Sequence, residues 1–227
     1  MKRVLIVCSL LLGICGSAQA GLLDPAAYDP SRYLPPPPAA GSVDNTAEFD
    51  ELKAIAARST PAEVAQAAHD ARDEKADLFN SAVGFDLLAL PETSKLLAMV
   101  GEEEDADTKV AKTYFHRIRP YAADPSIKTC ESVKPGKAAN ANSYPSGHAT
   151  LAFSTGVVLA ALLPSKSQAI LARASEYAEH RLVCGVHFRS DIVGGQEFGT
   201  ILAIKLMENP QFKAQMAKAQ AELAAHT

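Results

Sequence analysis

The sequence predicts an all-α protein built as a single-domain helical bundle. From about residue 45 onward the apolar residues follow helical spacing, and no alternating apolar and polar stretch of useful length indicates a β-strand. The chain has 227 residues, 48% hydrophobic and 21% charged, so it can bury the core of one globular domain. Its formal net charge of −4 and the lack of a basic block argue against nucleic-acid binding.

The first 20 residues have the pattern of an export signal. Residues 1–3 contain two basic side chains, residues 4–14 are apolar, and Ala18-Gln19-Ala20 is a small-x-small cleavage site, so we expect the mature chain to begin at Gly21. The apolar run is too short to span a bilayer, which takes about 20 residues. The sequence therefore predicts a periplasmic or secreted protein without stable membrane insertion, and retention as a membrane anchor is the alternative.

Removal of this signal would leave two of the four cysteines. Cys8 and Cys15 belong to residues 1–20, whereas Cys130 and Cys184 belong to the mature chain. Two cysteines allow one intramolecular pairing, and an oxidising exported compartment favours it. We therefore expect a Cys130–Cys184 disulfide, with two separate buried thiols as the alternative.

The segment that follows the signal is rich in proline. Residues 21–45 include a run of four prolines at 35–38, which is typical of an extended arm laid over the body of a protein. Residues 46–227 form the predicted helical domain. Its first helices are expected at 45–58, 61–80 and 94–100, separated by turn and proline signals. Thr60 before Pro61 is a favourable capped start for the second of them.

An acidic run at 102–107 precedes several basic residues up to Arg117. Acidic residues first and basic residues last suit the helix dipole, so the run predicts the solvated start of a helix rather than a metal site. Pro120 is expected to end that helix. Residues 121–144 are rich in Pro, Asn, Gly and Ser and predict a loop.

Four further helices complete the predicted bundle. The nearly unbroken apolar run at 149–163 is too short for a membrane span and is expected to form a buried core helix. The other three are expected at 167–184, 188–207 and 209–224.

Lys112 and Arg119 are the first of three groups of residues that suit phosphate chemistry. They are seven residues apart, which is two helical turns, so they can point to the same side of a helix. A guanidinium and an ammonium together can hold a tetrahedral oxyanion. Taken alone, such a pair is more often exposed and solvated.

Ser146, Gly147 and His148 form the second group, directly before the buried helix. Ser146 stands at the N-cap position, and Gly147 lets backbone N–H groups approach a ligand, so this helix start is a candidate anion site. His148 would then be placed as a proton donor. The alternative is a plain N-cap followed by a surface histidine.

Arg181, His187 and Asp191 form the third group. His187 and Asp191 are four residues apart, so on a helix the carboxylate can accept the imidazole N–H and turn the other nitrogen outward. This spacing supports His187 as a nucleophile. In isolation, an ordinary His–Asp pair on a helix surface is the alternative.

The three groups together read Lys112-x6-Arg119-Pro120, Pro145-Ser146-Gly147-His148 and Arg181-x5-His187-x3-Asp191. This pattern resembles the type 2 phosphatidic acid phosphatase (PAP2) superfamily, and most of all its soluble bacterial branch, the class A non-specific acid phosphatases. The proline run and the two mature cysteines are similar to that branch. The resemblance implies a helical bundle of the PAP2/haloperoxidase type, with an acid phosphatase domain at 46–227.

The resemblance also implies a role for each residue. His187 attacks phosphorus and forms a phosphohistidine, Asp191 orients His187, and His148 protonates the leaving group and then activates water. The residues implied to bind phosphate are Lys112, Arg119, Ser146, Gly147 and Arg181. Donors already in place around the phosphoryl oxygens make a metal unnecessary, so no cofactor is expected.

One position departs from the family pattern, because this chain has His180 where the family usually has Ser. One hydroxyl contact with phosphate is therefore in doubt. His180 either replaces that hydroxyl as a donor or turns away and leaves the contact to Arg181, and the sequence does not choose between the two.

Other functions fit parts of the sequence. A lipid or isoprenyl-diphosphate phosphatase usually spans the membrane, and a vanadium haloperoxidase is usually a much longer chain. A zinc site would use His116, His148, His180 and His187, although no HxH or HExxH spacing supports it. A non-enzymatic phosphate-binding protein would keep the cationic residues without turnover. The favoured function is hydrolysis of small-molecule phosphomonoesters, and phosphotransfer to other alcohols and assembly into a homodimer are left open.

Overall fold

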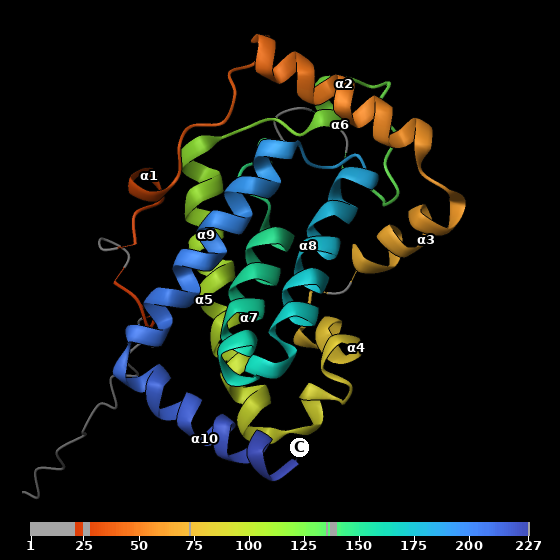
Figure 1. Cartoon of the computed structure of the whole chain (residues 1–227). Helices are drawn as coiled ribbons and strands as arrows, with labels where there is room; N and C mark the ends of the chain where they lie inside the picture. Colours follow the sequence, from red (N-terminus) through yellow and green to blue (C-terminus); the bar gives the residue numbers. More distant parts are fainter. Residues whose placement is uncertain (1–20, 25–27, 73, 135, 137–139, 227) are drawn as a thin grey trace, which may run out of the picture.

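The computed structural model describes residues 21–24, 28–72, 74–134, 136 and 140–226 (Figure 1). The predicted export signal at 1–20 lies outside the described residues. Within the described part the chain forms helices joined by loops, with no β-strand, so the predicted all-α class is confirmed. No helix in this part is both long and apolar enough to cross a membrane.

The helices of the described part are, in chain order, α1 Pro30–Tyr33, α2 Val43–Arg58, α3 Pro61–Asp70, α4 Asn80–Val83, α5 Pro91–Phe115, α6 Pro120–Ala123, α7 Gly147–Leu162, α8 Ser167–Val183, α9 Arg189–Glu208 and α10 Pro210–His226. Short 3-10 helices lie at Ala76–Phe79, Leu87–Ala89 and Pro164–Lys166. α2 and α7 to α10 begin and end within two residues of the bounds that the sequence predicts.

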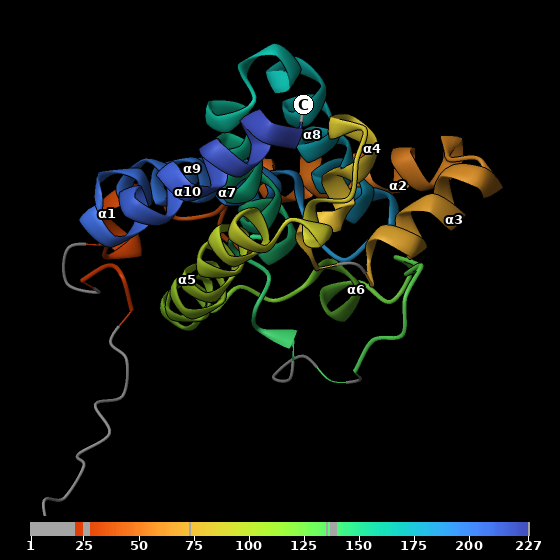
Figure 2. The same cartoon turned by 90° about the horizontal axis from the view of Figure 1, so that it is seen from below.

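The apolar helix α7 forms the centre of the bundle. It packs against α9, α8 and α5, which surround it in both views (Figures 1 and 2). Its side chains are apolar or small on almost every face, and Ala152, Val158 and Leu159 have no exposed surface. At the N-terminus of α7 the cap residue Ser146 is fully buried, whereas Gly147 and His148 of the first turn are half-buried.

Two glycines of α9 allow this helix to approach α7 closely. A Cβ atom added at Gly195 would lie 2.6 Å from the Ser146 carbonyl oxygen, and one added at Gly199 would collide with the Thr150 carbonyl oxygen. The close approach brings the starts of the two helices together, where the Ser146 N–H donates to the Asp191 carbonyl at 2.9 Å. The N-terminus of α7 and the N-terminus of α9 therefore meet at one end of the bundle.

The acidic run at 102–107 lies in the middle of a helix, so the prediction of a solvated helix start is wrong. The single helix α5 covers Pro91–Phe115, and it turns Glu103, Glu104 and Asp107 into the protein, where each is less than a tenth exposed. Burial raises the pKa of Glu104 to about 7 and, together with the nearby Glu103, that of Asp107 to about 7. The protonated forms reduce the cost of burying these side chains.

The end of α5 also differs from the prediction. The helix stops at Phe115 because His116 takes a left-handed conformation with φ of 49°, four residues before Pro120. The expected helix at 61–80 is likewise shorter, since α3 ends at Asp70 and a 3-10 helix follows at Ala76–Phe79. The Asp70 carboxylate is drawn into contacts with α8, which outweigh the helical propensity of the residues that follow.

The proline-rich arm lies along the bundle beside α9 and α5 (Figure 1). The Tyr28 hydroxyl donates to the Phe198 carbonyl at 2.6 Å, and the Tyr144 hydroxyl donates to the Pro35 carbonyl at 2.8 Å. Leu34 is buried between these contacts. The arm contains the short helix α1, which the sequence did not predict, and the boundaries at residues 21, 45 and 46 stay predictions.

Cys130 and Cys184 form a disulfide, so the expected pairing is confirmed. It joins the long loop between α6 and α7 to the end of α8. We expect the Cys130→Ser/Cys184→Ser double variant to lose about 3–4 kcal/mol of unfolding free energy, because a cross-link over 54 residues restricts the unfolded chain. Urea unfolding measures the loss.

Wild-type protein treated with a reductant is the matched control for this variant. Both samples should have the same unfolding midpoint, since each lacks the same cross-link. A double variant as stable as the oxidised wild type would contradict the prediction.

Candidate active site

A cavity of about 740 Å³ lies where α5, the start of α7 and the loop before α9 meet. The residues of the three sequence groups that line it are Lys112, Arg119, Gly147, His148 and His187. The tertiary structure thus brings together residues that are 75 positions apart in the chain (112 to 187). Lys112 comes from α5, Arg119 from the segment after it, and Gly147 and His148 from the first turn of α7.

His187 lies in the loop before α9 rather than on a helix. Its Nδ1 atom is 3.3 Å from the Asp191 carboxylate, and its Nε2 atom is 3.0 Å from Nη1 of Arg119. A guanidinium can only donate, so Nε2 is the acceptor and the ring proton is on Nδ1, facing Asp191. The Nε2 lone pair therefore accepts the Arg119 N–H at the wall of the cavity, on the side of the ring away from Asp191, as the spacing of His187 and Asp191 predicted.

Asp191 is fully buried and is held by several donors. Arg117 Nη1 donates to Oδ1 at 2.6 Å, and Ser143 Oγ and the Phe188 N–H donate to Oδ2 at 2.5 and 2.8 Å. The Phe188 contact is the N-terminal cap of α9, so one carboxylate both begins the helix and orients His187. These bonds fix the carboxylate on the Nδ1 side of the imidazole ring.

Arg117 is a central residue of the site that sequence reasoning missed. Its guanidinium is 8% exposed, donates to Asp191 and Ser190, and is paired through Nη2 with Glu48 of α2 at 2.5 Å. Its Cζ atom lies 4.2 Å from the centre of the Phe188 ring. No spacing in the sequence connects residue 117 with residue 48, so only the folded chain shows this network.

The start of α7 provides the backbone part of the site. Ser146 is fully buried, and its hydroxyl accepts the Ala149 N–H as the N-cap of the helix. A Cβ atom added at Gly147 would lie 3.1 Å from Lys112 Nζ, so a larger residue would crowd the ammonium. The positive end of a buried helix and the Lys112 ammonium therefore face the same space.

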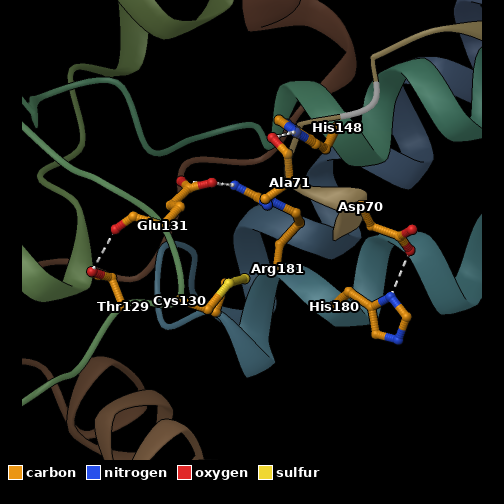
Figure 3. Close-up of a disulfide and its surroundings, with 9 residues drawn as sticks. Asp70, Ala71, Thr129, Cys130, Glu131, His148, His180 and Arg181 are labelled. Carbon is orange, nitrogen blue, oxygen red and sulfur yellow. Dashed lines mark hydrogen bonds and ion pairs between the residues drawn. A yellow bond between two sulfur atoms is a disulfide. The ribbon is translucent and has the colours of Figure 1, made fainter. Parts of the chain in front are cut away.

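Arg181 of α8 is 1% exposed and does not line the cavity, but its positive charge lowers the pKa of both His148 and His187. Its Nη2 donates to both carboxylate oxygens of Glu131 at 3.0 and 3.1 Å, and Glu131 follows the disulfide cysteine Cys130 (Figure 3). Its Nε and Nη1 are buried and have no hydrogen-bond partner among the described residues. Two donors of a buried guanidinium are thus free to bind an anion.

His148 is held between α7, α8 and the end of α3. Its Nε2 is 3.3 Å from the Ala71 carbonyl oxygen (Figure 3), and its Nδ1 is 3.4 Å from a carboxylate oxygen of Glu74. The ring stacks on Tyr177 with centroids 5.5 Å apart. Because a carbonyl can only accept, the Nε2 proton is fixed and Nδ1 is the atom that gains or loses a proton.

His180 turns away from the cavity, which decides between the two orientations that the sequence left open. Its Nδ1 is 2.6 Å from Asp70 Oδ2, on the side of α8 that faces α3 (Figure 3). Asp70 is fully buried and also accepts two hydrogen bonds from Arg173. His180 does not line the cavity and therefore does not replace the hydroxyl of the usual Ser.

The charges around the cavity shift the pKa values of its residues. Burial, Arg119 and Arg181 hold the pKa of His187 well below its usual value, which favours the neutral imidazole. Burial and Arg181 also lower the pKa of His148, and the Ala71 carbonyl opposes this effect. Burial and Arg119 lower the pKa of Lys112 to about 8.

Metal chemistry has no evident site in the described part of the chain. No group of three His, Cys, Asp or Glu side chains there is arranged to hold a metal ion. The zinc alternative with His116, His148, His180 and His187 therefore has no site among the described residues.

Comparisons with known proteins identify the family. The profile of the PAP2 superfamily matches residues 93–214. The chain is 31% identical to the non-specific acid phosphatase of Providencia stuartii, over 87% of this chain and 82% of that protein. It is 32% identical to the non-specific acid phosphatase of Salmonella typhimurium, over 84% and 78% of the two chains.

A solved structure has the same fold. The transmembrane PAP2 type phosphatidylglycerolphosphate phosphatase from Bacillus subtilis superposes with a TM-score of 0.56 at 18% identity, over 79% of this chain and 89% of that one. At this identity the likeness concerns the fold alone. The profile match over more than half of the chain and the relatives above 30% identity show that this protein belongs to the PAP2 superfamily.

Proposed function

We propose that this protein is an exported acid phosphatase that hydrolyses small phosphomonoesters through a phosphohistidine intermediate. The observation that carries the proposal is the neutral His187, whose Nε2 lone pair faces a cavity lined by Lys112 and Arg119. The names of the Providencia and Salmonella relatives support the same reaction class. The export step rests on the sequence pattern at residues 1–20.

The phosphate would be bound by donors from four segments of the chain. Lys112 and Arg119 supply positive charge, the start of α7 supplies the Gly147 N–H, and Arg181 supplies its two unpartnered nitrogens, Nε and Nη1. Ser146 contributes by capping α7 and so fixing the orientation of these backbone donors. Because the donors are already in place, the charge of the transition state is stabilised without a metal ion.

The first step forms a bond between His187 Nε2 and phosphorus and breaks the bond from phosphorus to the ester oxygen. The electron pair of that bond leaves with the oxygen, which takes a proton from Nδ1 of His148. The Asp191 carboxylate, 3.3 Å from His187 Nδ1, offsets the positive charge that the imidazole gains. Water then attacks phosphorus, His148 accepts its proton, and the N–P bond breaks.

The low pKa of His148 in the free protein is compatible with its role as an acid. Burial and Arg181 lower this pKa, whereas a bound phosphate anion would add negative charge next to the ring and raise it. Glu74, which is 3.4 Å from Nδ1, favours the protonated form as well. Substrate binding would therefore supply the proton that the leaving group needs.

Two groups with opposite charges set the expected alkaline limit of activity. Glu104 lines the cavity, and its pKa of about 7 means that it becomes negative above neutral pH. Lys112 has a pKa of about 8 and therefore loses its positive charge as the pH rises through 8. Both changes weaken binding of a phosphate anion, so kcat/KM is expected to fall steeply between pH 7 and 9.

The Glu104→Gln variant tests this explanation. Glutamine still accepts the hydrogen bond from Thr108, which is 2.7 Å from Glu104 Oε1, but it carries no charge. The KM of the variant at pH 8 should be about 3- to 10-fold lower than that of the wild type, with little difference at pH 5. Asp50→Asn, which changes an exposed carboxylate of α2 that does not line the cavity, is the control and should change KM less than two-fold. An equal effect of Glu104→Gln at both pH values would refute the explanation.

The function itself is tested by p-nitrophenyl phosphate hydrolysis at pH 4–9, with and without EDTA. Turnover that peaks at or below neutral pH and is unchanged by EDTA supports a metal-independent acid phosphatase. Loss of turnover on chelation would overturn the metal-free mechanism. Absence of turnover under all conditions would overturn the hydrolytic function and favour a phosphate-binding role.

A further inference from the structure

We propose that His180 is a positioning residue for proton transfer. By binding Asp70, it keeps the neighbouring Ala71 carbonyl in contact with His148, and this contact determines which ring nitrogen of His148 gains and loses the proton. This inference rests on the proposed function, because His148 is the acid of that reaction. It assigns a role to the residue that stands where the family usually has Ser.

Asp70 is the link between α8 and the end of α3. It is the last residue of α3, its side chain is 1% exposed, and His180 Nδ1 lies 2.6 Å from Oδ2. Arg173, two turns earlier on α8, donates to both oxygens of the same carboxylate at 2.9 Å. Gln66 donates to Oδ1 at 3.1 Å. The carboxylate is therefore held by buried or half-buried donors from α8 and by the exposed Gln66 of its own helix.

The residue after Asp70 carries the contact with His148. The Ala71 carbonyl oxygen is 3.3 Å from His148 Nε2, and the carbonyl is joined through one residue to the Asp70 side chain that His180 holds (Figure 3). Asp70 and Ala71 are joined by a planar peptide bond, and the Ala71 carbonyl begins the next peptide unit, so a shift of Asp70 is passed on to this carbonyl. Fixing the end of α3 thus fixes the acceptor for the Nε2 proton.

α8 also supports the ring of His148 directly. Tyr177 stacks on the imidazole, and the Arg173 guanidinium lies 5.7 Å from the Tyr177 ring centre. One face of α8 therefore presents Arg173, Tyr177 and His180 to the end of α3 and to His148. This face of α8 maintains the hydrogen bond from His148 Nε2–H to the Ala71 carbonyl. Nδ1 of His148, next to the cavity and Glu74, is then the nitrogen that gains and loses the proton.

Loss of the contact between the Ala71 carbonyl and His148 Nε2 would change which nitrogen of His148 carries the proton. With the Ala71 carbonyl displaced, a neutral His148 can carry its proton on either nitrogen, and the ring can turn. Only leaving groups that need a proton would be affected. A general acid contributes roughly 10²–10⁴-fold to such reactions, so partial loss of its orientation should cost a measurable part of that factor.

The experiment compares two substrates with the full mature protein. p-Nitrophenolate leaves without protonation, whereas a simple alkyl phosphate releases an alkoxide that must be protonated. We measure kcat/KM, because this ratio reports the phosphoryl transfer step and excludes hydrolysis of the phosphoenzyme, which both substrates share. For His180→Leu we expect about a 10-fold or greater fall with the alkyl phosphate and less than a two-fold fall with p-nitrophenyl phosphate.

Two further variants separate positioning from a merely structural role. His180→Asn places an amide donor near the position of Nδ1, so it should recover most of the alkyl phosphate activity. Asp70→Asn keeps the shape of the side chain but weakens the bonds from His180 and Arg173, and it should reproduce the selective loss. The Asp70→Asn variant also tests the proposal if the His180→Leu variant does not fold. A fall that is equal for both substrates in the folded variants would overturn the proposal.

A readout that needs no turnover accompanies the kinetics. In protein with ¹⁵N-labelled histidine, His148 of the wild type should show a proton on Nε2 only, and His180→Leu should show a mixture of both tautomers. An unchanged His148 tautomer in this variant overturns the inference even if activity changes. A wild type that hydrolyses neither substrate would instead overturn the proposed phosphatase function, and the assignment of a proton-transfer role with it.

Discussion

Replacing His187 with alanine should lower kcat by about 10⁴-fold or more with every phosphomonoester. His187 Nε2 is the unprotonated imidazole nitrogen in contact with Arg119 at the cavity, and Asp191 is positioned to stabilise its charged form. Without this nucleophile the phosphoryl group has no acceptor on the protein. Rapid acid quenching with a ³²P-labelled substrate should trap labelled wild-type protein and no labelled His187→Ala variant.

The control for this variant is another histidine of the same chain. His226 lies exposed at the end of α10, where its ring contacts Phe85, and it does not line the cavity. His226→Ala should keep the wild-type kcat and label to the same extent. Residual activity of His187→Ala above about 1% of the wild type, or a labelled variant protein, would show that another group attacks phosphorus.

Replacing Arg117 with methionine should remove about 3–5 kcal/mol of unfolding free energy, together with most of the activity. The guanidinium is buried and neutralises two buried carboxylates, Glu48 at 2.5 Å and Asp191 at 2.6 Å. Methionine fills much of the volume but leaves both carboxylates without their cation. Urea unfolding measures the loss of stability, and p-nitrophenyl phosphate hydrolysis measures the loss of activity.

The matched control is an ion pair on the surface. Lys53 and Asp124 are 3.1 Å apart, and their side chains are 52% and 30% exposed, so Lys53→Met should cost no more than about 1 kcal/mol. Adding Glu48→Gln to Arg117→Met should recover part of the loss, because it removes one of the two unpaired charges. An Arg117→Met variant within 1 kcal/mol of the wild type would contradict the role of this network.

Most helix positions could be predicted from local sequence. The apolar run of α7 and the capping residues Ser146 and Thr60 act on residues within one turn, so their effect can be read without a structure. The short helices α1, α4 and α6 were not predicted, and of the longer helices α3 and α5 differ from the prediction. Both depend on side chains that contact distant helices, Asp70 with α8 and the buried carboxylates of α5 with the interior.

In the candidate site, too, some features could be predicted from local sequence and others depend on contacts between distant segments. The spacing of the three groups identifies five residues that line the cavity, because each group lies within one short segment. The sequence assigned Lys112 and Arg119 to one helix and placed His187 on another, yet Arg119 and His187 lie in loops. Their side chains still meet, since the loops are fixed by Asp191 and its donors rather than by helical geometry.

The sequence by itself determined the all-α class and the disulfide partners, and its short spacings indicated the residues proposed to carry the chemistry, because these depend on composition, count and local pattern. Only the tertiary structure decided how these residues are charged and oriented. Arg117 meets Glu48 across 69 residues, and His180 meets Asp70 across 110. Burial and charge pairing over such separations set the protonation of His187 and His148, and they exist only after α7, α8 and α9 have packed together.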